Sequence, residues 1–238
     1  AAAEPGGMMR FGIPEYSLPR TLLRAEIDRI VSLGVKLRLN APLTAEFGLR
    51  QLRDAGFDSV FLSVGVSRGR DLQIPGVELD GVVKAVDYLL NINRGYRLQL
   101  GRRVVVIGGG FVAFDAARTV LRLGAQKVTV LYRRQVEDMP ADPREIKEAR
   151  EEGIEILPLV APVEFLGNGS VTGVRCVRME LKGFDDGGRR RPKTVPGSEF
   201  VVEADMVIPA ISQHSDLPFI DRDEVQLTKW GTLVVDKE

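Results

Sequence analysis

The feature that most constrains the fold of this chain is the run Gly108-Gly109-Gly110, which stands between two contrasting patterns. The run follows the β-branched segment Arg103–Ile107, which is typical of a strand covered on both faces. A helical pattern begins at Val112, and another strand pattern follows at Lys127–Tyr132. Strand, turn, helix and strand make a βαβ unit of about 30 residues with parallel strands. The sequence therefore predicts an α/β fold.

The same run matches the dinucleotide-binding fingerprint in the form Gly108-x-Gly110-x-x-Ala113. Gly108 permits a tight turn out of the strand, and Gly110 lets a pyrophosphate approach the backbone without an intervening side chain. Ala113 is small enough for the helix to pack closely on the strand. The free N–H groups at the start of the helix then bind phosphate. The sequence predicts a dinucleotide site here, the alternative being a structural turn without a ligand.

The residues after the second strand indicate which dinucleotide binds. A site for NAD places an acidic residue there to hold the ribose hydroxyls, whereas this chain has Tyr132-Arg133-Arg134. Two guanidinium groups bind a 2′-phosphate through charge-assisted hydrogen bonds. We therefore expect NADPH to be preferred over NADH, the alternative being an exposed basic pair without a ligand.

The chain shows no catalytic constellation of its own. It contains one cysteine, Cys176, and one histidine, His214, so neither an internal disulfide nor a histidine-based metal site is expected. Cys176 is interpreted as a half-buried structural thiol in a strand. Asp115, in the second turn of the fingerprint helix, is either functional or a carboxylate that favours the positive helix end. No catalytic residue and no metal site is predicted, and hydride transfer between nicotinamide and flavin requires no protein nucleophile.

Composition narrows the class of protein. Lys plus Arg and Asp plus Glu both number 33, which leaves no basic excess for binding nucleic acid. The sequence shows no signal segment and no apolar run of membrane-spanning length. We expect a cytoplasmic protein without a nucleic-acid or membrane partner.

Hydrophobic periodicity predicts further elements outside the βαβ unit. Helices are expected at 21–33, 44–56 and 82–90, and another starts with a capping box and a proline at 142–145. Strands are expected at 35–39, 59–64, 154–157 and 204–210. Residues 171–181 alternate as a long antiparallel strand does, 182–192 are expected to form an exposed hairpin loop, and the chain returns at 200–202.

Four stretches of the chain resemble a known family. They are 5–19, which contains Gly12-Ile13-Pro14-Glu15-Tyr16-Ser17-Leu18-Pro19; 108–119, the fingerprint helix; 128–140, which ends in Met139-Pro140; and 205–213. Together they resemble the small (beta) subunit of NADPH-dependent glutamate synthase and its relatives, a group of the pyridine nucleotide-disulfide oxidoreductase superfamily. The FAD and NADPH domains of dihydropyrimidine dehydrogenase are similar. The resemblance covers nearly the whole chain, which would be a fragment of such a protein.

The resemblance implies an FAD domain that is interrupted by an NADPH domain and resumes after it. Residues 1–97 would be a partial FAD-binding segment, 98–212 the NADPH-binding domain and 213–238 the start of the returning FAD segment. The expected fold is a Rossmann-like dinucleotide-binding domain. It would have a parallel sheet with helices on both faces and an antiparallel β-meander, flanked by parts of an incomplete FAD domain.

The resemblance also implies roles for individual residues. Gly109, Gly110, Phe111 and Val112 would contact the pyrophosphate, Arg133 and Arg134 would hold the 2′-phosphate, and Ala210, Ile211 and Ser212 would lie near the nicotinamide half. Gly7, Met8 and Leu43 would face the FAD.

The implied function is that of the NADPH-binding portion of a flavoprotein oxidoreductase. In the full-length parent, hydride would pass from NADP(H) to FAD and on to a partner redox subunit or iron–sulfur domain, similar to the large subunit of glutamate synthase. The fragment alone is expected to be inactive. The alternative is a non-catalytic nucleotide-binding module with a regulatory or assembly role.

Overall fold

A computed structural model of the chain describes residues 2–66, 68–185, 187–220 and 225–236. The helices are α1 (Gly7–Phe11), α2 (Arg20–Val31), α3 (Leu49–Asp54), α4 (Ala85–Asn93), α5 (Phe111–Arg122) and α6 (Pro143–Glu151), with a 3₁₀ turn at Val136–Asp138. The strands are β1 (Arg68–Gly69), β2 (Arg103–Ile107), β3 (Lys127–Tyr132), β4 (Glu155–Pro158), β5 (Val160–Asn168), β6 (Ser170–Phe184), β7 (Arg190–Thr194), β8 (Phe200–Glu203), β9 (Met206–Pro209) and β10 (Gln213–His214).

The chain divides into two compact units. The larger unit consists of Phe11–Ser17 and Gly69–Ser212, and the smaller unit of Ala1–Arg10, Leu18–Arg68 and Gln213–Glu238. The boundary after Ser212 coincides with the expected end of the NADPH domain, whereas the larger unit starts earlier than residue 98 and includes α4. That these units are an NADPH domain and part of an FAD domain stays a prediction.

A four-stranded parallel sheet forms the centre of the larger unit. Its strands lie in the order β4-β3-β2-β9, and every neighbouring pair is parallel. Numbered along the chain, this is the 3-2-1-4 order of a dinucleotide-binding half. The middle strands are buried because their β-branched residues have cover on both faces.

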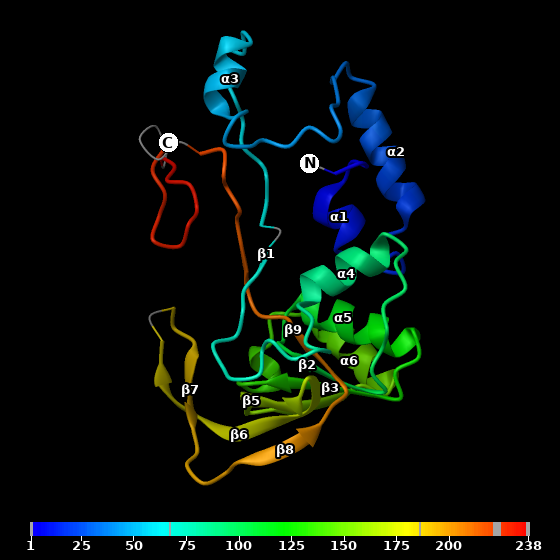
Figure 1. Cartoon of the computed structure of the whole chain (residues 1–238), viewed down its shortest axis with the longest axis vertical. Helices are drawn as coiled ribbons and strands as arrows, with labels where there is room; N and C mark the ends of the chain where they lie inside the picture. Colours follow the sequence, from blue (N-terminus) through cyan, green and yellow to red (C-terminus); the bar gives the residue numbers. More distant parts are fainter. Residues whose placement is uncertain (1, 67, 186, 221–224, 237–238) are drawn as a thin grey trace. The chain divides into compact units, whose positions relative to one another are not determined.

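The helices and a second sheet cover opposite faces of the parallel sheet (Figure 1). Val104, Val106 and Ile208 pack with residues of α4, α5 and α6, among them Tyr88 and Phe114. The alternate strand residues point the other way and pack with the antiparallel sheet of β5, β6, β7 and β8; this second cluster comprises Val105, Ile107, Leu131, Val160, Phe165, Val171, Val174, Cys176, Ala204 and Val207.

The predicted α/β class and the βαβ unit are confirmed, with one correction. Helices were expected on both faces of the parallel sheet, but in the described part of the larger unit the antiparallel sheet takes the place of helices on one face. The reason is that β6 alternates apolar and polar residues, so it presents a whole apolar face to the parallel sheet. The expected hairpin is also present, although its strands are longer than expected, because β6 continues to Phe184 and β7 begins at Arg190.

Two predicted strands of the smaller unit are wrong. Residues 35–39 and 59–64 are both described, and neither contains a strand. Their apolar side chains are exposed, up to 93% for Phe61, except for the half-buried Leu62. Alternation and β-branching favour a strand only where a neighbour accepts its backbone hydrogen bonds, and neither segment is paired. The helix expected at 44–56 is shorter than predicted, because residues 44–47 form a turn closed by the Thr44 hydroxyl, which accepts from Phe47 N at 3.1 Å.

Cys176 is more deeply buried than expected. It lies in β6 with 0% exposure, and burial raises the pKa of its thiol to about 12. The thiol therefore stays protonated and unreactive at neutral pH.

None of the helices in the described ranges is long and apolar enough to cross a membrane. The cytoplasmic location stays a prediction.

Candidate functional site

The fingerprint residues lie at the carboxyl edge of the parallel sheet. Gly108 follows β2 directly, and Ala210 follows β9, the neighbouring strand. The Ala210 N–H donates to the Ile107 oxygen at 2.8 Å, so the two loops begin side by side. In sheets of this order, ligands bind outside the carboxyl ends of the strands where the strand order reverses, which here is between β2 and β9.

Two of the three glycines are required by the packing of the larger unit. Gly108 has φ +148°, and a Cβ there would lie 2.5 Å from the Ala210 oxygen and 3.3 Å from the Ala113 Cβ. A Cβ at Gly109 would lie 2.7 Å from the ring of Tyr132. Ala113 itself is fully buried. The glycine turn is thus packed closely against the loop after β9, the ring of Tyr132 and the first turn of α5, as the fingerprint requires.

Gly110 differs, because nothing in the structure requires a glycine there. Its φ of −96° is open to any residue, and a Cβ would meet nothing within 4 Å. Gly110 is the N-cap of α5, and it provides no side chain to cap the helix. Among the described residues, none accepts a hydrogen bond from the N–H of Phe111 or Val112. The helix start therefore presents free donors to an open space, as an anion site does.

The two arginines after β3 have different environments. Arg133 is exposed, and its guanidinium has no hydrogen-bond or ion-pair partner within the described part of the chain. The Arg134 side chain is only 7% exposed and pairs with Asp185 at 3.1 Å. Arg134 is therefore already engaged, whereas Arg133 is available to a ligand.

The remaining predicted residues are divided between the units. Ala210, Ile211 and Ser212 follow β9 in the larger unit; Ala210 and Ile211 pack against the two core clusters, and Ser212 has φ +48°. Gly7 and Met8 lie in α1 and Leu43 in a loop of the smaller unit. Their assignment to FAD stays a prediction.

A pocket that the sequence did not predict begins at the same helix start. Its volume is about 410 Å³, within the range of small-molecule sites. Its lining residues come from the 11–17 segment, α5 and the start of α6: Tyr16, Ser17, Phe111, Arg118, Arg122, Asp142, Arg144, Glu145 and Glu148. Only the N-terminal signal of α6 could have indicated it, and the Asp142 carboxylate does cap that helix by accepting from Arg144 N at 2.8 Å.

Tyr16 closes one side of this pocket. The Arg122 guanidinium carbon lies 3.9 Å from the centre of the Tyr16 ring, and that of Arg118 lies 5.4 Å from it. Arg118 also pairs with Glu152 at 2.6 Å and Glu148 at 2.9 Å, which joins α5 to α6. Cation–π contacts and ion pairs thus hold the 11–17 segment and both helices together.

Asp115 lies in α5, near Tyr16 and Arg118, and its carboxyl group has an unusual pKa. Burial, and secondly the negative charge of Glu145, raise the pKa of Asp115 from 3.8 to about 7. Burial also raises the pKa of Glu145. A carboxylate stabilised by the helix end would show a lowered pKa, so the interpretation of Asp115 as a dipole-favoured residue is not supported.

Replacing Asp115 with Asn is expected to stabilise the chain, and more at pH 8 than at pH 5. Because the pKa of Asp115 is higher in the folded chain, the folded state binds more protons between pH 3.8 and about 7, and stability falls as pH rises through that window. Asn removes this loss of folding free energy, which amounts to about 2.5 kcal/mol between pH 5 and pH 8. Urea denaturation of both proteins at the two pH values measures it. An equal gain at both would show that Asp115 does not titrate in this range.

Comparison with known proteins gives a consistent set of relatives. Residues 24–238 match the family described as pyridine nucleotide-disulphide oxidoreductase. The chain is 45% identical over 235 residues to the NADPH-Fe(3+) oxidoreductase subunit beta of Geobacter sulfurreducens, which covers 96% of this chain and 35% of that protein. It is 38% identical to the glutamate synthase [NADPH] small chain of Azospirillum brasilense, which covers 97% of this chain and 51% of that protein. The resemblance inferred from the sequence motifs is thus confirmed.

Solved structures share the fold. Mycobacterium tuberculosis FprA in complex with NADPH matches with a TM-score of 0.77 at 19% identity, over 90% of this chain and 63% of that one. The chain spans about a third to a half of the length of these two curated relatives.

Proposed function

Since this chain belongs to the pyridine nucleotide-disulphide oxidoreductase family, we propose that it is the NADPH-binding portion of a flavoprotein oxidoreductase. In the whole protein, hydride passes from NADPH to FAD, and the electrons go on to a partner redox subunit. Relatives named as a subunit beta and a small chain support such a partner. The proposed partner is a redox subunit or an iron–sulfur domain that resembles the large subunit of glutamate synthase.

The observation that carries the proposal is the open helix start at Gly110. Gly108 and Gly109 are explained by their packing, but Gly110 has free space around it and an ordinary backbone conformation. A glycine there leaves the space beside the backbone open to a group from outside the chain. The uncapped N–H groups of Phe111 and Val112 and the positive end of α5 suit a pyrophosphate in that space.

The adenosine end of the nucleotide is assigned to the loop after β3. In this fold the ribose lies beyond the second strand, where the exposed guanidinium of Arg133 has no partner among the residues that the structure describes. A guanidinium matches a 2′-phosphate and favours NADP(H) over NAD(H). Ala210, Ile211 and Ser212, at the end of the adjoining β9, are proposed for the nicotinamide half, and Gly7, Met8 and Leu43 for the flavin.

When bound, NADPH supplies the hydride and FAD accepts it. The residues of this chain bind and orient the nucleotide, and no side chain is required as a nucleophile. The buried thiol of Cys176 suits this assignment, because it is held in the second core cluster rather than at the carboxyl edge.

Replacing Arg133 with Gln is expected to weaken NADP⁺ binding by about 10- to 100-fold and NAD⁺ binding by less than about twofold. The physical reason is that only NADP⁺ carries the 2′-phosphate that Arg133 binds. Calorimetric titration of each protein with both nucleotides measures the two affinities. Arg97→Gln, at another exposed arginine of the larger unit, is the control and should change neither.

Two results would oppose the proposal in different ways. Equal losses for NADP⁺ and NAD⁺ in the Arg133 variant would assign the residue to a part that the nucleotides share. Failure of the unaltered chain to bind either nucleotide at millimolar concentration would contradict nucleotide binding by this chain altogether.

A further inference from the structure

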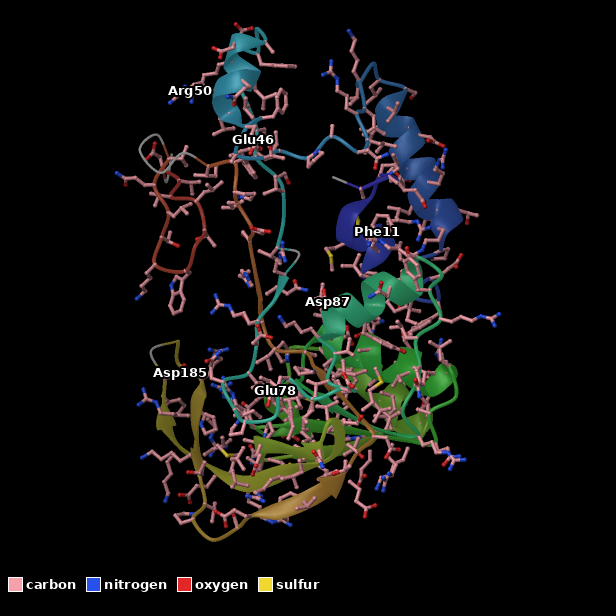
Figure 2. All side chains as sticks on the ribbon, in the orientation of Figure 1. Phe11, Glu46, Arg50, Glu78, Asp87 and Asp185 are labelled. Carbon is pink, nitrogen blue, oxygen red and sulfur yellow. The ribbon has the colours of Figure 1, made fainter. Side chains whose placement is uncertain are left out.

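The second arginine after β3 is tied to a hairpin about 50 residues further along the chain. The Arg134 Nε donates to the main-chain oxygen of Arg190 at 2.8 Å, and its Nη2 donates to Asp185 Oδ2 at 3.1 Å. Asp185 and Arg190 bracket the turn between β6 and β7, and Asp185 lies at the tip of this hairpin (Figure 2). The fork of the Arg134 guanidinium is thus directed into the hairpin and away from solvent.

Asp185 holds the turn and Arg134 at once. Its Oδ1 accepts hydrogen bonds from the N–H of Gly187 at 3.1 Å and of Arg189 at 2.9 Å. Its Oδ2 pairs with Arg134 and with Arg189, the latter at 3.3 Å. The N–H of Arg189, together with these other donors and cations, lowers the pKa of Asp185, so that it is ionised at neutral pH. One carboxylate therefore connects the hairpin turn to the loop after β3.

Other contacts hold the loop around Arg133. The main-chain oxygen of Arg134 accepts from Leu159 N at 3.0 Å, and the side-chain oxygen of Gln135 accepts from Arg190 Nη1 at 3.2 Å. The Tyr132 hydroxyl donates to the Asp138 oxygen at 2.7 Å. Arg133 lies between these anchored residues and has an exposed side chain without a partner in the described ranges. Its Cα is therefore placed by its neighbours, and the hairpin holds the nearest of them.

We infer that the β6–β7 hairpin sets the nucleotide preference of the chain: Asp185 and the main chain of Arg190 hold Arg134 as a positioning residue, which places Arg133 for the 2′-phosphate. This inference rests on the proposed function and deepens it. It also replaces the expectation that both arginines bind the phosphate. The negative charge of Asp185 would repel a 2′-phosphate and so weaken NADP⁺ binding. By holding Arg134, Asp185 would instead strengthen NADP⁺ binding, so the two effects have opposite signs.

This difference in sign makes Asp185→Asn a decisive variant. Asn keeps an oxygen for the N–H groups of the turn but loses the charge that holds Arg134. Positioning predicts that the dissociation constant for NADP⁺ rises about three- to tenfold and that for NAD⁺ stays within about twofold. If Arg134 were a phosphate ligand, its release and the loss of a nearby negative charge would strengthen NADP⁺ binding instead.

Three further variants exclude a merely structural effect. Arg134→Lys keeps the positive charge but lacks the guanidinium fork that reaches both Asp185 and Arg190. If Arg134 positions Arg133, this variant should lose the preference for NADP⁺ over NAD⁺. If Arg134 binds the phosphate directly, the variant should retain that preference. In an Arg133→Gln background, Asp185→Asn should have no further effect on the ratio of the two affinities, because it acts through Arg133. Glu180→Gln removes a carboxylate that pairs with Lys182 on the same strand, and it should leave both affinities unchanged.

The titrations separate the inference from the proposed function. If the unaltered chain prefers NADP⁺ and Asp185→Asn keeps or strengthens that preference, the positioning role is wrong and the proposed function stands. If the unaltered chain shows no preference, both are wrong. Loss of preference in Asp185→Asn and Arg134→Lys, but not in Glu180→Gln, supports the inference.

Discussion

Replacing Gly110 with Asp is expected to weaken NADP⁺ binding severely while the stability of the chain stays the same or rises. Gly110 is the N-cap of α5 and has an extended conformation that Asp adopts freely. Asp is among the preferred N-cap residues, because its carboxylate accepts hydrogen bonds from the free N–H groups of the first turn. Its side chain enters open space, so it displaces nothing in the protein.

The same carboxylate occupies the position assigned to the pyrophosphate. It would take up the N–H groups of the helix start and repel the phosphates, so the dissociation constant for NADP⁺ should rise by about 100-fold or more. Calorimetric titration measures this, and thermal unfolding measures the stability. Gly110→Asn adds nearly the same volume without charge, so it should weaken binding less. Unchanged affinity in the Asp variant would place the nucleotide somewhere else.

Replacing Gly108 with Ala, unlike the change at Gly110, is expected to lower the stability of the chain strongly. A Cβ there would lie 2.5 Å from the Ala210 oxygen, and the φ of +148° is one that residues with side chains rarely adopt. The clash is with backbone, so it cannot be relieved by a rotamer change. Strain and displacement together should cost about 3 kcal/mol.

Urea denaturation measures this loss as a lowered midpoint, and Gly110→Ala is the matched control. The control adds the same methyl group two residues away, in open space and at φ −96°, so it should lose less than about 1 kcal/mol. Equal losses for the two variants would show that the turn is not packed against Ala210 as described.

The architecture around the fingerprint could be predicted because its signals are local. The β-branched runs became β2 and β3, and the proline and Asp142 at the start of α6 became a helix cap. The two wrong strands, at 35–39 and 59–64, show the limit of such signals. Alternating apolar residues indicate that a segment can form a strand. Whether it does depends on a neighbouring strand to pair with, which the sequence pattern does not identify.

The position of the site could be predicted from the sequence, but the roles of its individual residues could not. Gly108 and Gly110 were assigned by motif, and the structure shows that packing explains one and not the other. Arg133 and Arg134 are adjacent and chemically identical, so no local pattern separates them. The difference arises from Asp185, which is distant in sequence and reaches Arg134 only through the register of the β6–β7 hairpin. The pocket beside Phe111 was missed for the same reason, because its arginines and carboxylates come from separate segments.

Nucleotide binding at Gly110 and Arg133 is tested directly by calorimetric titration of the unaltered chain with NADP⁺ and, separately, with NAD⁺. We expect one NADP⁺ to bind per chain, clearly more tightly than NAD⁺. Absence of binding by both nucleotides at millimolar concentration, or equal affinity for the two, would contradict the assignment of an NADPH site to the turn at Gly110 and to Arg133.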